Sequence, residues 1–81
     1  MEYLVGRLKK DVIIGHFWFA FLENPSGDVC IRPRTAILPC GNFAGNKRHP
    51  RKMRVGEDVA YVLEQRLDGK LRAKAWRPIE W

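Results

Sequence analysis

The chain has 81 residues, and its 15 Lys and Arg against 9 Asp and Glu give a formal net charge of +6. A chain of this length forms one domain with a thin core, because it buries only about 60% of the surface that it exposes when unfolded. The apolar run at 12–22 is too short to span a membrane, which takes about 20 residues, and it does not resemble a secretory signal. We therefore expect a single soluble domain over residues 1–81, located in the cytoplasm. The basic excess indicates phosphate-rich partners or an anionic membrane surface, and of these we expect the phosphate-rich partner and no membrane association.

Five segments have the composition or the alternation of β-strands, and they lie at residues 3–9, 12–22, 28–32, 57–67 and 70–76. The charged residues at 9–11 end or bend the first strand, and the Asn-Pro and Ser-Gly-Asp sequence at 23–28 is typical of a turn. The fourth segment fits a helix about as well as a strand by periodicity. Its short length and the Asp68-Gly69 pair after it favour a strand that leads into a hairpin.

The last strand alternates small apolar residues with larger, mostly basic ones. Leu71, Ala73 and Ala75 share one face, and the other face carries Lys70, Arg72, Lys74 and Trp76. This pattern predicts a half-buried strand with a basic outer face.

Residues 33–54 differ from the rest, because their prolines, glycines and asparagines leave no room for a long regular element. One helical turn capped by Thr35 is compatible with the sequence. The remainder, 38–54, reads as a long basic loop inserted between the third and fourth strands. It carries Arg54 and four further basic residues, here named the loop cations: Lys47, Arg48, Arg51 and Lys52. A loop of this length in a small domain is usually functional or disordered.

These segments predict an all-β protein, a five-stranded antiparallel barrel with a long basic loop between the third and fourth strands. The second strand is unusual because both of its faces are largely apolar. Phe17, Phe19 and Phe21 alternate with Trp18 and with smaller neighbours, so one apolar face must point away from the barrel interior. A covering loop or a dimer interface would explain this face, and so would a platform on which unpaired bases stack.

The chain resembles the cold-shock domain, a five-stranded OB-fold family, in motifs spread over most of its length. The matching segments are GRLKKD at 6–11, FAFL at 19–22, GDVCIRPRTAI at 27–37, MRVGEDVAYVLE at 53–64 and GKLRAKA at 69–75. Parts of the pattern are also shared with bacterial translation initiation factor one and with the OB modules of exoribonucleases. The resemblance implies an OB-fold, RNA binding and an RNA chaperone activity.

The resemblance is incomplete at the family's stacking positions. The tryptophan of the first strand falls on Lys10, the aromatic residue of the second motif on Cys30, its histidine on Arg32, and the next aromatic residue on Pro33. The platform would therefore consist of the phenylalanines, and Arg32 would stack on a base or bind phosphate.

The alternation and the resemblance predict the same core when Phe19 and Phe21 point outward. The expected core residues are Leu8, Trp18, Ala20, Leu22, Val29, Ile31, Val59, Tyr61, Leu63 and Leu71, with a position at the barrel rim as the alternative for Trp18.

Two functions remain open from the sequence. The first is binding of single-stranded nucleic acid, RNA before DNA, through Phe stacking and phosphate contacts of Lys and Arg. The expected binding residues are Lys10, Phe17, Phe19, Phe21, Arg32, Lys47, Arg48, Arg51, Lys52, Arg54 and Lys74. The second is a protein–protein adaptor whose phenylalanine strand packs on a partner within a ribonucleoprotein complex.

We expect no enzymatic activity, because the sequence shows no Ser-His-Asp set, no phosphate-cradling glycine loop and no evident carboxylate pair. We also expect no metal and no cofactor. Cys30 and Cys40 form no Cys-x-x-Cys pair, and the two histidines lie too far apart for a His-x-x-x-His pair. Both cysteines are expected to be free thiols.

Overall fold

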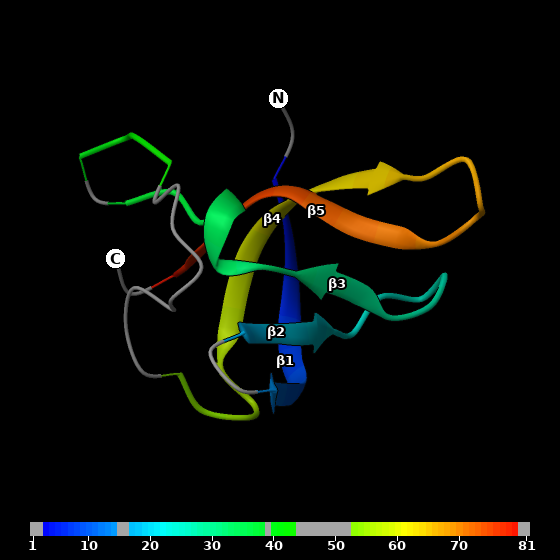
Figure 1. Cartoon of the computed structure of the whole chain (residues 1–81), viewed down its shortest axis with the longest axis horizontal. Coiled ribbons are helices and arrows are strands. Elements are labelled where there is room, and N and C mark those ends of the chain that lie inside the picture. The colour runs from blue at the N-terminus through cyan, green and yellow to red at the C-terminus, as the bar shows by residue number, and fades with distance from the viewer. Residues whose placement is uncertain (1–2, 15–16, 39, 44–52, 80–81) are drawn as a thin grey trace.

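The computed structural model describes residues 3–14, 17–38, 40–43 and 53–79, and its five strands close into a barrel (Figure 1). The strands are β1 (Leu4–Ile14), β2 (Phe17–Leu22), β3 (Val29–Ile31), β4 (Asp58–Gln65) and β5 (Leu71–Pro78), and a short 3-10 turn, η1 (Pro33–Thr35), follows β3. Their order around the barrel is β1, β2, β3, β5, β4. The described residues contain no α-helix. The prediction of an all-β barrel of five strands is confirmed, and the architecture is consistent with an OB-like fold.

One pair of neighbouring strands is parallel. β3 and β5 run in the same direction, with Val29 opposite Leu71 and Cys30 opposite Arg72, and the other four neighbouring pairs are antiparallel. The prediction of a wholly antiparallel barrel is therefore wrong. The reason is one of parity, because strand directions cannot alternate all the way around a closed ring with an odd number of strands.

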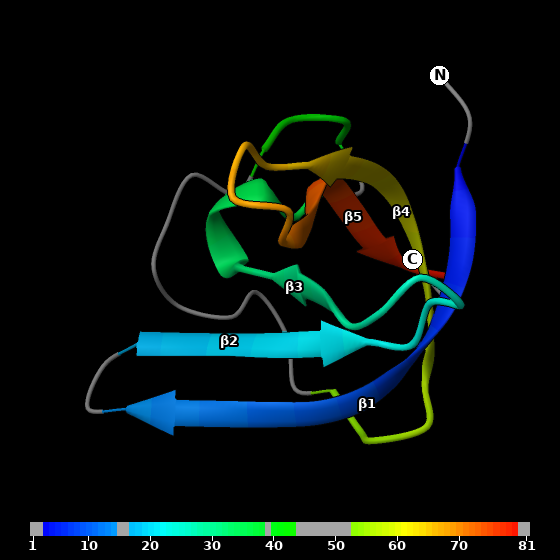
Figure 2. The ribbon, with the colours of Figure 1, turned by 90° about the vertical axis from the view of Figure 1, so that its right-hand side faces the viewer.

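The β1–β2 hairpin divides the apolar run that the sequence suggested as one strand. β1 continues to Ile14 and β2 begins at Phe17, so the expected strand at 12–22 is wrong at its first residues. A β-bulge between Leu8 and Lys10 bends β1 without ending it. β1 pairs with β4 over residues 4–7 and with β2 over residues 8–14. The outer half of the hairpin thus projects beyond the barrel (Figure 2).

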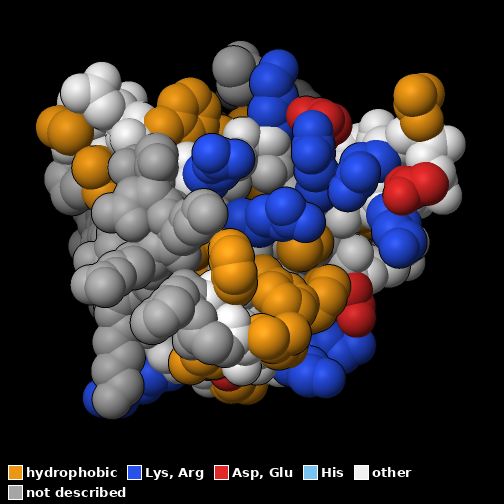
Figure 3. Space-filling model, viewed as in Figure 1, with side chains coloured by type: hydrophobic (Ala, Val, Ile, Leu, Met, Phe, Trp, Pro, Cys, Tyr) orange, Lys and Arg blue, Asp and Glu red, His pale blue; other side chains and the backbone are white. Residues whose placement is uncertain are grey.

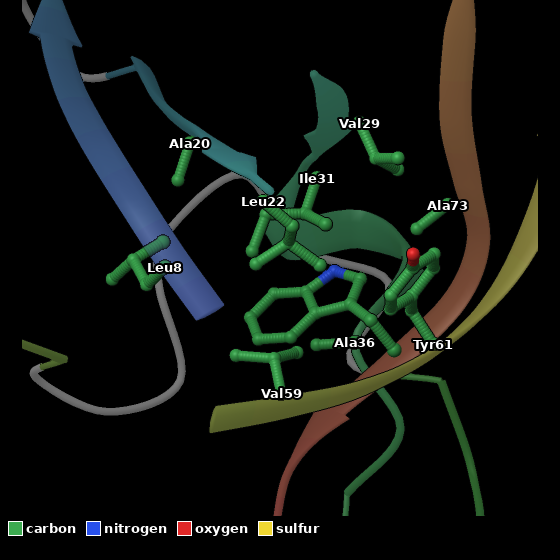
Figure 4. Close-up of a cluster of buried hydrophobic side chains, with 10 residues drawn as sticks. Leu8, Ala20, Leu22, Val29, Ile31, Ala36, Val59, Tyr61 and Ala73 are labelled. Atoms are coloured by element: carbon green, nitrogen blue, oxygen red, sulfur yellow. The ribbon is translucent and has the colours of Figure 1, made fainter. Parts of the chain in front are cut away.

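The core is formed by side chains from all five strands, which converge inside the barrel (Figure 4). Its buried members are Leu8, Ala20, Leu22, Val29, Ile31, Ala36, Val59, Tyr61, Ala73 and Trp76. Trp18 and Leu71, both expected in the core, are only partly buried and pack against this cluster. The outward orientation of Phe19 and Phe21 is confirmed, because the alternating residues Ala20 and Leu22 are fully buried.

Leu63 was expected in the core and is exposed. β1 covers β4 only over residues 58–61. Leu63 pairs with Ala73 on the part of β4 beyond that cover. The side chain therefore lacks the neighbouring strand that buries Val59 and Tyr61.

A second β-bulge explains why Trp76 is buried, although strict alternation places it on the basic face. Val62 pairs with Ala75 and Leu63 with Ala73, so Lys74 is one extra residue on β5. An extra residue inverts the alternation of everything that follows it. Trp76 consequently turns inward, becomes fully buried and lies 6.0 Å from Trp18 between ring centroids.

The connections between strands agree in part with the sequence. The turn at 23–28 is present, with the amide of Gly27 donating to the carbonyl of Asn24 over 2.9 Å, and the β4–β5 hairpin turns at Asp68 and Gly69. Thr35 does not begin the helical turn but ends it, and its hydroxyl donates to the Arg32 carbonyl. Most of the loop predicted at 38–54 lies outside the described residues. Within the described part of the chain, no helix has the length and apolarity needed to cross a membrane.

Candidate functional site

A continuous row of outward-facing side chains crosses the barrel on its outer surface. Lys10 on β1 pairs with Phe21 on β2, which in turn pairs with Cys30 on β3. Cys30 pairs with Arg72 on β5, and Arg72 pairs with Glu64 on β4. Residues directly opposite each other on neighbouring strands share a face. The row therefore combines an aromatic ring, a thiol and three charged groups on one surface.

A groove lies along this surface, between β2 and the β4–β5 hairpin. Its apolar part is formed by Phe19, Phe21, Cys30 and Leu71. Five cations line it: Arg32, Arg66, Lys70, Arg72 and Lys74. Two carboxylates, Asp28 and Glu64, also line it, so the groove carries a positive excess. In Figure 3 a band of Lys and Arg side chains lies next to a cluster of hydrophobic side chains on this face.

The two phenylalanines of the groove form an aromatic corner, the name used below for Phe19 and Phe21 together. Their ring centroids are 5.8 Å apart and their planes are nearly perpendicular, at 88°. This edge-to-face arrangement is a favourable one for an aromatic pair. A planar ligand that lies flat on one ring meets the edge of the other, so the corner offers room for one stacked ring.

Arg32 is held at the end of the groove by its backbone. The indole N–H of the buried Trp76 donates to the Arg32 carbonyl over 2.7 Å, and η1 begins directly after Arg32. The backbone position is therefore fixed from the core, and the side chain remains exposed. This arrangement suits a cation that contacts a ligand in the groove.

Both groove carboxylates form ion pairs. Glu64 pairs with Arg72 on the neighbouring strand at 2.7 Å, and Asp28 pairs with Lys9 at 3.1 Å. Four of the five groove cations form no ion pair with any described residue: Arg32, Arg66, Lys70 and Lys74. These four cations are the ones best able to meet an anionic ligand.

The remaining residues expected in the site lie in several places. Lys10 is exposed beside the aromatic corner, next to Phe21. Phe17 lies farther out on the hairpin and does not line the groove. Arg54 lies in the turn before β4, where its amide donates to the Glu57 carboxylate, and it does not line the groove either. The loop cations lie outside the described residues.

Three cations of the groove were missing from the expected site: Arg66, Lys70 and Arg72. The sequence did contain a signal for two of them, because Lys70 and Arg72 belong to the basic face of the last strand. Their role depends on which strand lies next to β5. The parallel pairing of β5 with β3 brings this basic face beside Cys30 and Arg32.

Across the described residues, no group of three or more His, Cys, Asp or Glu side chains is placed to hold a metal ion. Cys30 and Cys40 are both free thiols, as expected, and Cys30 lies half-buried in the groove. The site therefore presents stacking surfaces, cations and a thiol.

Comparison with known proteins gives no assignment for the chain. No family model matches it, and no curated protein shows significant similarity to it.

Proposed function

We propose that the protein binds single-stranded nucleic acid, RNA in preference to DNA, in the groove across β2, β3 and β5. The protein would be an OB-fold module related to the cold-shock domain, as its sequence motifs suggest. The aromatic corner would stack an unpaired base, and Arg32, Lys70 and Lys74 would contact the phosphates. Stacking on an aromatic side chain contributes about 1–3 kcal/mol per base.

The observation that carries this proposal is the position of the aromatic corner beside unpaired cations in one groove. Phe19 and Phe21 stand outward on a strand whose alternate residues are buried, so core packing alone does not require aromatic rings there. An apolar ligand would not need the cations, and a simple anion would not need the rings. A nucleotide strand combines planar bases with phosphates and matches both.

The test compares a labelled single-stranded RNA of about ten nucleotides, within the range bound by one OB-fold, with a duplex of the same length. We expect tighter binding of the single strand, because only unpaired bases can reach the ring faces. The matched variant is Phe19→Leu/Phe21→Leu, which keeps the apolar surface and removes the rings. It should abolish the preference for single strands. Equal affinity of the unaltered protein for the duplex would reject base stacking.

The salt dependence of binding tests the phosphate interactions separately. Neutralising Lys70 and Lys74 to Gln should lower the slope of log affinity against log salt by about 0.7 for each phosphate that the protein no longer neutralises. The Leu variants should leave this slope unchanged. A slope that does not respond to the two Gln substitutions would remove these lysines from the interface.

A second function, that of a protein–protein adaptor, is favoured by the β1–β2 hairpin. Ile13, Ile14 and Phe17 are 70%, 61% and 54% exposed near its end, and neighbouring large apolar side chains on a surface are typical of an interaction site. An adaptor would use this end of the hairpin rather than the groove. We therefore expect Ile13→Thr/Ile14→Thr to retain RNA affinity and to lose an association that persists in high salt. RNA affinity that falls with this variant would place the hairpin in the nucleic-acid interface instead.

A further inference from the structure

The ion pair between Arg72 and Glu64 uses only one of the two carboxylate oxygens. Nε and Nη2 of Arg72 both donate to the same oxygen, Oε1 of Glu64, over 3.1 and 2.7 Å. Two donors on one acceptor fix the orientation of the guanidinium plane. Among the described residues, Oε2 of Glu64 accepts no hydrogen bond. The groove therefore contains an oriented planar cation beside a carboxylate oxygen that is open to a ligand.

The other groove carboxylate provides an internal comparison. Lys9 Nζ approaches both oxygens of Asp28, at 3.1 and 3.3 Å, so neither oxygen is left without a partner. Exposed ion pairs of this kind contribute little to stability, and a carboxylate in a basic groove repels phosphate. The free Oε2 of Glu64 therefore weakens the binding of phosphate. A role in selecting the ligand would offset this loss of affinity.

Arg72 and Glu64 lie on strands that are separated from the aromatic corner by β3. Arg72 is two strands away from Phe21 around the barrel, which corresponds to roughly 10 Å at about 4.8 Å per strand. This backbone separation is more than the spacing of two stacked bases requires, so the ion pair suits the nucleotide next to the one at the corner. A nucleic-acid strand that runs across β2, β3 and β5 would bring that neighbouring nucleotide to Arg72.

We propose that Arg72 and Glu64 form a second base subsite, which selects bases that carry an exocyclic amino group. The inference rests on the proposed binding of single strands. The guanidinium plane of Arg72 supports the base by stacking, and Oε2 of Glu64 accepts a hydrogen bond from the amino group. The ligand at this subsite is cytosine, adenine or guanine rather than uracil or thymine.

The chemistry of the pyrimidines explains the preference. Cytosine presents its N4 amino group as a donor, and a carboxylate accepts from it. Uracil has a carbonyl oxygen at the same position. Two carbonyl oxygens flank the N3–H of uracil. These oxygens repel a carboxylate, so uracil binds less well beside Glu64. The two bases are nearly equal in size, so comparing them isolates the contact with Glu64.

The experiment measures affinities for labelled oligo(C) and oligo(U), each of about ten nucleotides, at neutral pH. The unaltered protein should prefer oligo(C) by at least roughly tenfold, the lower end of what one hydrogen bond to a charged group contributes. Glu64→Gln should remove most of this preference and raise the affinity for oligo(U), because it removes a negative charge and adds an amide donor for the uracil carbonyl.

Asp28→Asn is the matched control, since it removes the other groove carboxylate. It should change both affinities by the same factor and leave their ratio unaltered. Arg72→Lys keeps the charge and removes the plane, so it should weaken both oligonucleotides without changing the salt slope. Thermal melting of each variant verifies the fold.

Two outcomes would reject the base subsite without rejecting the proposed binding of single strands. One is an oligo(C) to oligo(U) ratio near one in the unaltered protein, and the other is a ratio that Glu64→Gln and Asp28→Asn change equally. Failure to bind either oligonucleotide would instead reject the proposed function together with the subsite.

Discussion

The orientation of β2 predicts opposite effects for truncations on its two faces. Leu22 is fully buried, and replacing a buried leucine by alanine costs about 2–5 kcal/mol. For a domain of this size each kcal/mol lowers the melting temperature by roughly 4–8 °C. Leu22→Ala should therefore lower the melting temperature by at least about 8 °C, which is the product of the two lower limits. RNA affinity of the molecules that remain folded should be unchanged, because Leu22 does not line the groove.

Truncating the aromatic corner should have the reverse effect. Phe19 and Phe21 are only half-buried, so Phe19→Ala/Phe21→Ala forfeits part of the about 1.5–3 kcal/mol that full burial of each ring contributes. It also removes an edge-to-face interaction worth about 0.5–1.5 kcal/mol. The domain should stay folded at room temperature. Binding of single-stranded RNA should fall by about 1–3 kcal/mol, the value of one stacked base.

Thermal melting followed by circular dichroism and fluorescence anisotropy with labelled RNA measure the two effects on the same samples. The expected pattern is a large melting shift with intact binding for Leu22→Ala and the opposite for the corner variant. A corner variant that unfolds while Leu22→Ala keeps its melting temperature would refute the orientation of β2. A folded corner variant that still binds RNA at full strength would refute stacking and leave the orientation intact.

Three further predictions concern the core, the packing of β1 and the loop. Trp76→Phe removes the indole donor to the Arg32 carbonyl, which still accepts from the amide and the hydroxyl of Thr35, so the lost hydrogen bond should cost about 0.5–1.5 kcal/mol in urea unfolding; an unchanged midpoint would show that the bond from Trp76 does not stabilise the fold. Gly6→Ala places a Cβ 2.9 Å from the Glu23 carbonyl oxygen and 3.0 Å from the Tyr61 ring, so we expect about 1–3 kcal/mol of destabilisation from overpacking, and wild-type stability would contradict this close packing. Replacing all loop cations by Gln should flatten the salt dependence of RNA binding by about 0.7 for each phosphate left without its cation and should not lower the melting temperature; an unchanged slope would assign the loop to another role.

The faces of β2 and β3 were predictable from the sequence because strict alternation holds there. Ala20 and Leu22 are buried on one face of β2, and Val29 and Ile31 on one face of β3, as expected. The hairpin turn at Asp68 and Gly69 also followed from local chemistry, since glycine readily adopts the positive φ of 84° found at Gly69. These features depend on residues that are close together in the sequence, so they can be predicted from a single segment.

The two β-bulges were not predictable by the same reasoning. A bulge depends on the register between two strands, and a single strand gives no sign of it. The extra residue Lys74 on β5 turns Trp76 inward. The expectation that Trp76 lies on the outer face is therefore wrong, whereas Ala73 and Ala75 are buried as expected.

The groove depended on a third kind of information, the order of strands around the barrel. An odd number of strands requires a parallel neighbour pair, and here that pair is β3 with β5. The pairing places Arg72 of one sequence segment beside Cys30 of another, and it brings Glu64 of β4 to the same surface. The cations of the last strand are solvated charges when they are read alone. In the folded barrel they line one groove together with the aromatic corner, and this explains why reasoning from single segments found the rings and missed Arg72.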